Sequence, residues 1–239
     1  MNKQYKNIVI LTGAGISAES GLATFRSSNG LWNNHRVEDV ATVEAFARNP
    51  EYVHEFYNEL KQELIRAVPN PAHLALAKLQ QNYPAPVTIV TQNVDTLHEK
   101  AQSTGVLHIH GQINQAVCLN CGHVLETWGD VNTETVCRQC GVPAMMKPNI
   151  VFFGENLLCM DKVDRLLEQC DLFVSIGTSG VVFPAASFVQ IAKLNGAETY
   201  EFNLETTSNN RYFDHHIYGK AGETVPQFVD TLLTEAPKQ

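Results

Sequence analysis

Four of the six cysteines in the sequence have the spacing of a metal site. They form two Cys-x-x-Cys pairs, Cys118 with Cys121 and Cys137 with Cys140, and 15 residues separate the pairs. Zinc binds four thiolates in a tetrahedron, and each such turn supplies two of them. We expect no export signal at the N-terminus, so a metal site is favoured over disulfides, with two redox-active dithiols as the alternative. Four protein ligands would leave no position for water, which predicts one structural zinc ion.

The residues around these cysteines fit the same interpretation. Gly122 and Gly141 follow the two pairs, and glycine suits a backbone that loops back beneath its own ligands. Cys159 and Cys170 stand alone in the sequence, and we expect both to be buried as small apolar side chains.

A glycine-rich segment follows the first strongly apolar run. Residues 7–11 read NIVIL, which predicts a buried strand, and residues 13–18 read GAGISA. Glycines after a strand let the backbone turn sharply and approach a pyrophosphate, which then meets the free N–H groups of the following helix. The alternative is a glycine turn into a packed helix, because no acidic residue follows a clear second strand about 20 positions later.

Two further segments place polar side chains where chemistry is expected. Residues 91–95 read TQNVD at the end of a predicted strand and could bind a ribose or an amide, with helix capping by Asn93 or Asp95 as the alternative. In the segment HIHG, an extended backbone puts His108 and His110 on one face. Histidine is a natural general base near neutral pH, although a single histidine is more often structural.

Short apolar strands alternate with helical patterns along the chain. The predicted strands are 7–11, 86–91, 171–176 and 198–203, and the predicted helices are 50–66, 71–81, 95–102, 161–169, 184–195 and 223–235. Asn70 and Pro71 fit the N-cap and first position of their helix, in which we expect Leu74, Ala75 and Leu79 to face inward. The alternation predicts an α/β fold with a doubly wound parallel sheet, where ligands bind at the carboxyl ends of the strands.

Composition and charge exclude several classes of protein. Hydrophobic residues make up 44% of the 239 residues and charged residues 18%, which is typical of a globular chain. The longest apolar run, residues 8–11, is too short to span a bilayer. The formal net charge is −8, from 17 basic and 25 acidic residues, and the basic residues do not cluster. We therefore expect a cytoplasmic protein that binds neither nucleic acid nor membrane.

Taken together, these segments resemble the sirtuins, the NAD-dependent protein lysine deacylases. The shared motifs occur in one order: GAGISAESGLATFR, TQNVDTLH, HIHG, the paired Cys-x-x-Cys, KPNIVFFGE, GTSGVVFPAA and FNLE. The resemblance extends from residue 7 to about residue 232, and the compact chain is similar to bacterial members. It implies NAD as co-substrate, an acyl-lysine protein or peptide as partner, and free lysine, nicotinamide and O-acyl-ADP-ribose as products.

The resemblance also implies how the chain is divided. A Rossmann-like parallel sheet that binds NAD would comprise residues 1–35, 70–111 and 147–239, with a smaller zinc-binding lobe inserted into it. Residues 36–69 would form the helical part of that lobe, and residues 112–146 its zinc-ribbon module. We expect a monomer.

Site residues follow from the resemblance position by position. His110 matches the catalytic base, and Asn93 and Asp95 match residues that orient the ribose and the carboxamide. The positions that match NAD-binding residues are Gly13, Ala14, Gly15, Ser17, Ala18, Glu19, Thr24, Phe25, Arg26, Gln92, Asn93, Asp95, Gly177, Thr178, Ser179, Asn203, Leu204, Glu205 and Ala221. The strand that pairs with the substrate backbone corresponds to Phe153, Gly154 and Glu155.

The acyl pocket departs from the desuccinylase branch of the sirtuins, which the chain otherwise resembles. In that branch a small alanine widens the pocket, and a tyrosine and an arginine three residues later hold the acyl carboxylate. This chain has Ala41 and Tyr57 but carries Leu60 at the arginine position, on the same helix face as Tyr57. Lys61 could partly replace the arginine, and for Leu64 the better interpretation is a core position. We therefore expect removal of acetyl and larger neutral acyl groups in preference to succinyl.

Three other functions share part of this pattern. A mono-ADP-ribosyltransferase would use the same NAD site, and a non-catalytic module would bind NAD or acyl-lysine without turnover. A simple NAD dehydrogenase would share the glycine loop but would not explain the HIHG segment beside a closed zinc module.

Overall fold

A six-stranded parallel sheet forms the centre of the computed structural model, which describes residues 4–24, 31–32 and 35–236. The strand order is β11-β10-β9-β1-β4-β5. The strands are β1 (Ile8–Thr12), β4 (Val87–Thr91), β5 (Leu107–His108), β9 (Leu172–Ile176), β10 (Glu198–Asn203) and β11 (His215–Tyr218). The predicted doubly wound parallel sheet is confirmed, and the order reverses at β1, between β4 on one side and β9 on the other.

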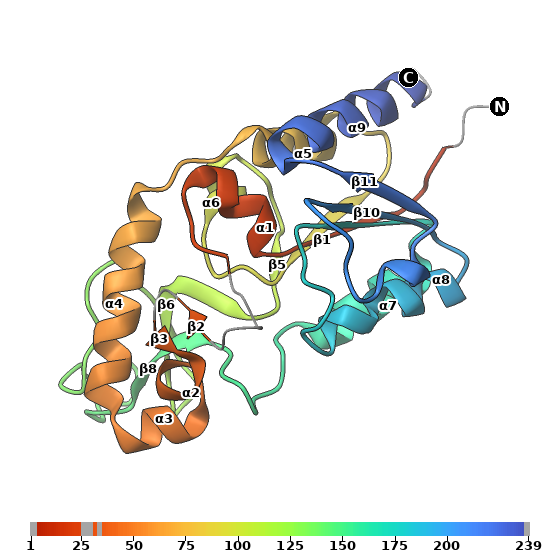
Figure 1. Ribbon diagram of the computed structural model, residues 1–239. Helices are drawn as coiled ribbons and strands as arrows, with labels where there is room; N and C mark the ends of the chain where they lie inside the picture. The colour runs from red at the N-terminus through yellow and green to blue at the C-terminus, as the bar shows by residue number, and fades with distance from the viewer. Residues whose placement is uncertain (1–3, 25–30, 33–34, 237–239) are drawn as a thin grey trace.

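Helices cover both faces of the sheet, as Figure 1 shows. One face packs against α5 (Pro71–Asn82) and α9 (Ala221–Glu235), and the other packs against α7 (Met160–Gln169) and α8 (Phe188–Leu194). Successive strand residues alternate between the faces: Ile8 and Ile10 belong to the first core and Val9 and Leu11 to the second. Burial on both faces explains why the strands read as continuous apolar runs.

Helix α5 begins where its sequence predicts but turns a different side chain outward. The Oδ1 atom of Asn70 accepts a hydrogen bond from the backbone N–H of Ala72 at 3.0 Å, and proline occupies the first helical position. The expectation that Leu74 faces inward is wrong, because this side chain is 54% exposed. The buried stripe instead includes Ala72, Leu76 and Leu79, which are spaced for one helix face.

A second, smaller lobe lies beside the main sheet (Figure 1). Its helices are α2 (Val37–Val40), α3 (Val43–Arg48) and α4 (Pro50–Arg66). Three of its strands, β6 (Gly111–Cys118), β7 (Val124–Glu126) and β8 (Met146–Ile150), form an antiparallel sheet in the order β7-β6-β8. A separate antiparallel pair consists of the short strands β2 (Leu31–Trp32) and β3 (His35–Arg36). A separate apolar core joins α2, α3 and α4 to the β7-β6-β8 sheet through Ile113 and Ile150.

Several short helical elements complete the fold. They are α1 (Ala14–Ser17), η1 (Ala18–Ser20), α6 (Leu97–Lys100), η3 (Ala185–Ser187) and η4 (Asn210–Tyr212). The Nζ atom of Lys100 donates to the carbonyl oxygens of Leu64, Ile65 and Ala67, so α6 is attached to the C-terminal end of α4. Within the described part of the chain, no helix combines the length and the apolar character needed to cross a membrane.

Candidate functional site

The loops after β1 and β9 meet at the point where the strand order reverses. The backbone N–H of Gly15 donates to the carbonyl oxygen of Gly177 at 2.9 Å. A Cβ atom on Gly15 would lie 2.6 Å from the Cα atom of Gly177, and Gly177 itself has a φ of 63°. Both glycines are therefore required for the two loops to touch. In doubly wound folds the crevice beside such a reversal is where ligands bind.

A cavity of about 760 Å³ opens at these loops and extends toward the smaller lobe. Most of the residues predicted for the site line it, from both parts of the fold. They are Gly13, Ala14, Gly15, Ser17, Ala18, Thr24, Ala41, Tyr57, Leu60, Gln92, Asn93, Asp95, His110, Phe153, Gly154, Glu155, Gly177, Thr178, Ser179, Asn203, Leu204, Glu205 and Ala221. The volume falls within the usual range for a cofactor site, and the donors and acceptors fit a dinucleotide with its ribose hydroxyls.

One predicted residue lies away from the cavity, and two are not described by the structure. Glu19 is not among the lining residues; its Oε2 atom accepts a hydrogen bond from the backbone N–H of Gly222 at 2.7 Å, at the start of α9. A carboxylate at this position caps the positive end of the helix. Phe25 and Arg26 lie outside the described residues.

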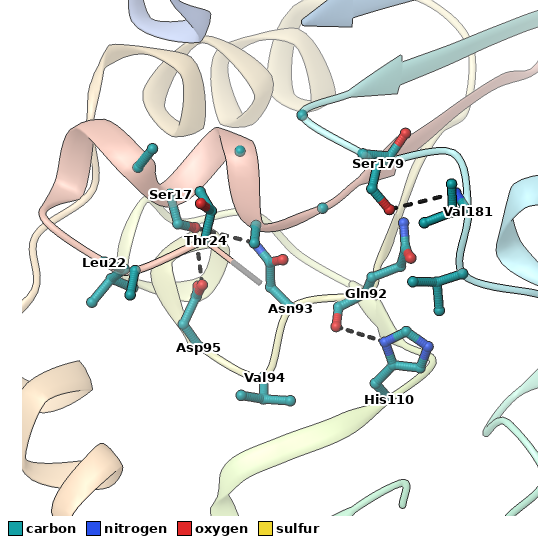
Figure 2. A pocket seen from close by; sticks show the side chains of 18 of the residues that line it. Ser17, Leu22, Thr24, Gln92, Asn93, Val94, Asp95, His110, Ser179 and Val181 are labelled. Carbon is teal, nitrogen blue, oxygen red and sulfur yellow. Dashed lines mark hydrogen bonds between the residues drawn. The ribbon is translucent and has the colours of Figure 1, made fainter. Parts of the chain in front are cut away.

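Polar side chains from α1 and from the loop after β4 form one hydrogen-bonded group, shown in Figure 2. The Oγ atom of Ser17 donates to Asp95 at 2.9 Å and accepts from the amide nitrogen of Asn93 at 3.1 Å. Burial raises the pKa of Asp95, whereas hydrogen bonds from Leu97 and Ser17 and the nearby His108 lower it. The other oxygen of Asp95 accepts from the backbone N–H of Leu97 at 3.0 Å, so the carboxylate both caps α6 and faces the cavity.

His110 faces the cavity with one ring nitrogen already engaged. Its Nδ1 atom lies 2.9 Å from the carbonyl oxygen of Gln92, and a carbonyl can only accept, so Nδ1 carries the proton. No described residue forms a hydrogen bond with Nε2, which Figure 2 shows on the far side of the ring from Gln92. Burial lowers the pKa of His110, although the hydrogen bond to Gln92 opposes this shift. The ring is therefore held neutral, with a free lone pair available to accept a proton.

The opposite end of the cavity is mostly apolar. Ala41, Tyr57 and Leu60 line it together with Leu64, and each of these four side chains is no more than 6% exposed. Leu64 is a core residue, as expected, but it also reaches the cavity wall. Among the described lining residues there is no lysine or arginine.

Lys61, which the sequence leaves open as a partial replacement for the arginine, does not line the cavity. Its side chain is 3% exposed, and its Nζ atom donates to the carbonyl oxygen of Gly129 at 2.8 Å. Position 61 is one residue beyond Leu60, so the helical turn carries it away from the cavity and toward the cysteine-rich module. The ammonium group thus joins α4 to that module.

An extended segment after β8 borders the cavity between the two parts of the fold. The backbone N–H of Phe153 donates to the carbonyl oxygen of Ala41 at 2.8 Å, which ties the segment to the end of α2. Behind it, the buried Nζ atom of Lys147 lies 2.8 Å from the carboxylate of Glu155, which also accepts from the backbone N–H of Phe152 at 2.7 Å. The Phe153 side chain is 49% exposed, so this edge presents both backbone and apolar surface to a ligand.

The four paired cysteines converge outside the cavity. All four Sγ atoms lie within 4.8 Å of one another, and the distances Cys118–Cys140 and Cys121–Cys137 are both 3.7 Å. A tetrahedral zinc site with bonds of about 2.3 Å would separate its sulfur atoms by about 3.8 Å, so the donor set fits. Gly122 and Gly141 have φ values of 72° and 71°, a conformation that favours glycine.

The two isolated cysteines have different environments. Cys170 is buried, as expected, and burial raises its pKa to about 11. The same expectation for Cys159 is wrong, because that side chain is exposed at the N-cap of α7.

Several lining residues were not predicted from the sequence. Glu63 lines the cavity one helical turn beyond Leu60, and a helical-spacing argument could have found it. Val181 and Phe183 also line it, within a motif already noted, and Phe183 is 70% exposed. Leu22 and Val94 line the cavity as well, but their apolar side chains gave no reason to predict them from the sequence.

Comparisons with known proteins agree with this geometry. A model of the Sir2 family matches residues 13–184 of the chain. The chain is 51% identical to an NAD-dependent protein deacylase of Vibrio parahaemolyticus, over 98% of each chain. Among solved structures, an ADP-ribose complex of a Sir2 homologue has a TM-score of 0.89 at 38% identity, over 96% of this chain and 93% of that one. A complex of Sir2 with a p53 peptide and NAD+ has a TM-score of 0.79 at 29% identity, over 98% and 95% of the two chains.

Proposed function

The chain belongs to the Sir2 family, and we infer from this that it is an NAD-dependent protein deacylase that acts on acylated lysine side chains. The observation that carries the inference is the arrangement of one continuous cavity. A neutral histidine and a Ser–Asn–Asp group lie on one side of it, and an apolar end lies on the other. A relative that holds both a peptide and NAD+ supports a protein or peptide as the partner.

Different residues of the cavity suit different parts of the co-substrate. The loops at Gly13–Gly15 and Gly177 line the cavity beside a reversal of strand order, and the glycines there carry no side chain that would keep a pyrophosphate away from the backbone. Asn93 and Asp95, held through Ser17, suit the ribose and the carboxamide of the co-substrate. Bound NAD would supply a nicotinamide leaving group and the ribose carbon that receives the oxygen of the acyl group.

His110 supplies the proton chemistry. Its Nε2 lone pair faces the cavity while Nδ1–H is fixed on the Gln92 carbonyl, so the ring can accept a proton from a ribose hydroxyl. The amide oxygen of an acyl-lysine is a weak nucleophile, so its reaction depends on being held against the ribose carbon. The extended segment at Phe153–Glu155 would hold the substrate backbone for this purpose.

The apolar end selects the acyl group. Its described lining contains Ala41, Tyr57, Leu60 and Leu64 and no cationic side chain. A succinyl carboxylate buried there would lose its hydration without gaining a charged partner. Acetyl and larger neutral acyl groups are therefore the preferred substrates, and succinyl a poor one.

The cysteine cluster would hold one structural zinc ion. Four thiolates fill a tetrahedral coordination sphere, so the ion would stabilise the module and would take no part in the reaction. We propose that the NAD-binding domain comprises residues 1–35, 70–111 and 147–239, with residues 36–69 as the helical part of the small lobe and residues 112–146 as its zinc module. The strands β2 and β8 cross these bounds, because both pair within the small lobe. The enzyme would act as a monomer in the cytoplasm, and size-exclusion chromatography with light scattering tests its oligomeric state.

Product analysis distinguishes this function from its alternatives. Incubation with NAD and an acetyl-lysine peptide should release nicotinamide and free lysine together. A mono-ADP-ribosyltransferase would release nicotinamide and label a protein, a dehydrogenase would yield reduced cofactor, and a binding module would leave both substrates unchanged. Any of these three outcomes would overturn the proposal.

A further inference from the structure

The first histidine of the HIHG segment lies beneath the cavity wall and uses both of its ring nitrogens. The Nδ1 atom of His108 is 3.1 Å from the carbonyl oxygen of Asn93, and its Nε2 atom is 2.9 Å from the Oε1 atom of Glu99. The His108 side chain is 5% exposed, whereas that of Glu99 is 37% exposed. His110, two residues later, bonds through one nitrogen only.

These two contacts together determine the protonation state of the His108 ring. A carbonyl oxygen only accepts hydrogen bonds, so Nδ1 must be a donor. The carboxylate of Glu99, which reaches solvent, also only accepts. Both contacts exist together only when the ring carries a proton on each nitrogen.

We propose that His108 is a positioning residue: held as an imidazolium by Glu99, it clamps the carbonyl of Asn93 and thereby fixes the Asn93 side chain in the cavity. The titratable groups around His108 are Asp95, Glu99 and His98. His98 stays neutral there, because burial and the neighbouring histidines hold its pKa well below the ordinary value.

The clamp completes a set of bonds that holds Asn93 at three points. Its backbone N–H donates to the Oγ1 atom of Thr91 at 3.0 Å, its carbonyl accepts from His108, and its amide donates to Ser17 at 3.1 Å. Only the last of these involves the side chain that faces the co-substrate. Loss of the His108 contact would free the backbone carbonyl of Asn93 and so loosen the backbone from which this side chain projects.

Nitrogen NMR tests the protonation state directly. In protein labelled with 15N-histidine, the ring signals that vanish in His108→Asn are assigned to His108. Near neutral pH the wild type should show both nitrogens in the protonated range, and Glu99→Gln should convert one of them to the unprotonated type. The matched control, Glu168→Gln on the exposed face of α7, should leave the spectrum unchanged. A wild-type His108 with one unprotonated nitrogen overturns the proposal.

Calorimetric titration with NAD tests the positioning role, which rests on the proposed function. His108→Leu removes the donor and should weaken NAD binding about fivefold, close to 1 kcal/mol. His108→Asn keeps an N–H donor at the place of Nδ1 and should bind within about twofold of the wild type. Equal loss in both variants, or loss in neither, contradicts the clamp. The titration needs no turnover, so an enzyme that binds NAD but fails to deacylate would overturn the proposed function and leave this result standing.

Discussion

The Nδ1 atom of His110 lies 2.9 Å from the carbonyl oxygen of Gln92, in the loop that also carries Asn93 and Asp95. The base and the residues expected to orient the ribose are thus fixed to the same segment, residues 92–95, directly after β4. Because the carbonyl imposes the tautomer, the free Nε2 lone pair is present before any ligand binds. Rate loss on changing the ring should therefore reflect lost proton transfer rather than lost binding.

Replacing the base should abolish turnover and spare binding. His110→Tyr is expected to lower kcat by at least about a hundredfold, because a positioned base contributes on the order of 10²–10⁴. Calorimetric NAD affinity should stay within about threefold, and the melting temperature should show a folded protein. A variant that keeps a tenth of the wild-type kcat/KM would refute the assignment.

The pH profile of the reaction should show the effect of burial on the same residue. Burial lowers the pKa of His110 from its ordinary value of 6.5, so the neutral, base form persists at lower pH. The acidic limb of kcat/KM should therefore lie below pH 6.5 and be missing from the residual activity of His110→Tyr. A half-maximal rate at or above pH 6.5 would be inconsistent with this environment.

Much of this arrangement could be predicted from sequence, where local signals were strong. Asn70 and Pro71 marked the start of α5, and buried strands such as β1 and β9 read as apolar runs bounded by glycine. The strand β11 (His215–Tyr218) was missed. It lies at the sheet edge, and its mostly exposed side chains do not show the alternation of apolar and polar residues that predicts a strand.

Side-chain direction was harder to predict than element type. Helical spacing alone leaves Leu74 and Leu76 of α5 as equal candidates for the core, and only the packing against the sheet decides between them. Similarly, spacing allows Lys61 to approach Tyr57, but its partner Gly129 lies in a module distant in sequence. Both outcomes depend on tertiary contacts that no local pattern encodes.

The acyl preference should change with one substitution in α4. Leu60→Arg places a guanidinium beside Tyr57, and a charge-assisted contact is typically worth about 1.5–3 kcal/mol. Desuccinylase kcat/KM should rise about tenfold or more, measured with matched succinyl and acetyl peptides. Lys61→Met is the control and should leave the ratio unchanged, since Lys61 bonds to Gly129. A wild type that already prefers succinyl-lysine would show that the interpretation of Leu60 is wrong.

Metal content should depend on the buried thiolates. Elemental analysis should give one zinc per chain, and Cys137→Ala should lose it together with thermal stability, because the module has only a small core of its own. The exposed Cys159 provides a matched control, and Cys159→Ala should retain both the metal and the melting temperature. Full stability and activity in a metal-free preparation would argue against a structural zinc ion.

Two buried histidines should make the fold sensitive to acid. Burial lowers the pKa of His73 to about 4, and that of the adjacent His98 lies well below its ordinary value. Above pH 6.5 both are neutral whether folded or not; below it, only the unfolded chain takes up the protons. The free energy of unfolding should therefore fall between pH 6.5 and about 4, by up to about 1.4 kcal/mol per pH unit for each histidine.

Urea unfolding measures that slope. His73→Gln removes one titrating group, so its slope below pH 6.5 should be smaller than that of the wild type. Equal slopes in the wild type and in His73→Gln would show that His73 takes up its proton in the folded state as well.

The stoichiometry of the reaction tests the central claim most directly. Purified protein, NAD and an acetyl-lysine peptide should yield nicotinamide, deacetylated peptide and O-acetyl-ADP-ribose in equal amounts by mass spectrometry. The reaction should depend on NAD and be lost in His110→Tyr. Nicotinamide release without matching free lysine, or free lysine formed without consumption of NAD, would contradict an NAD-dependent deacylase.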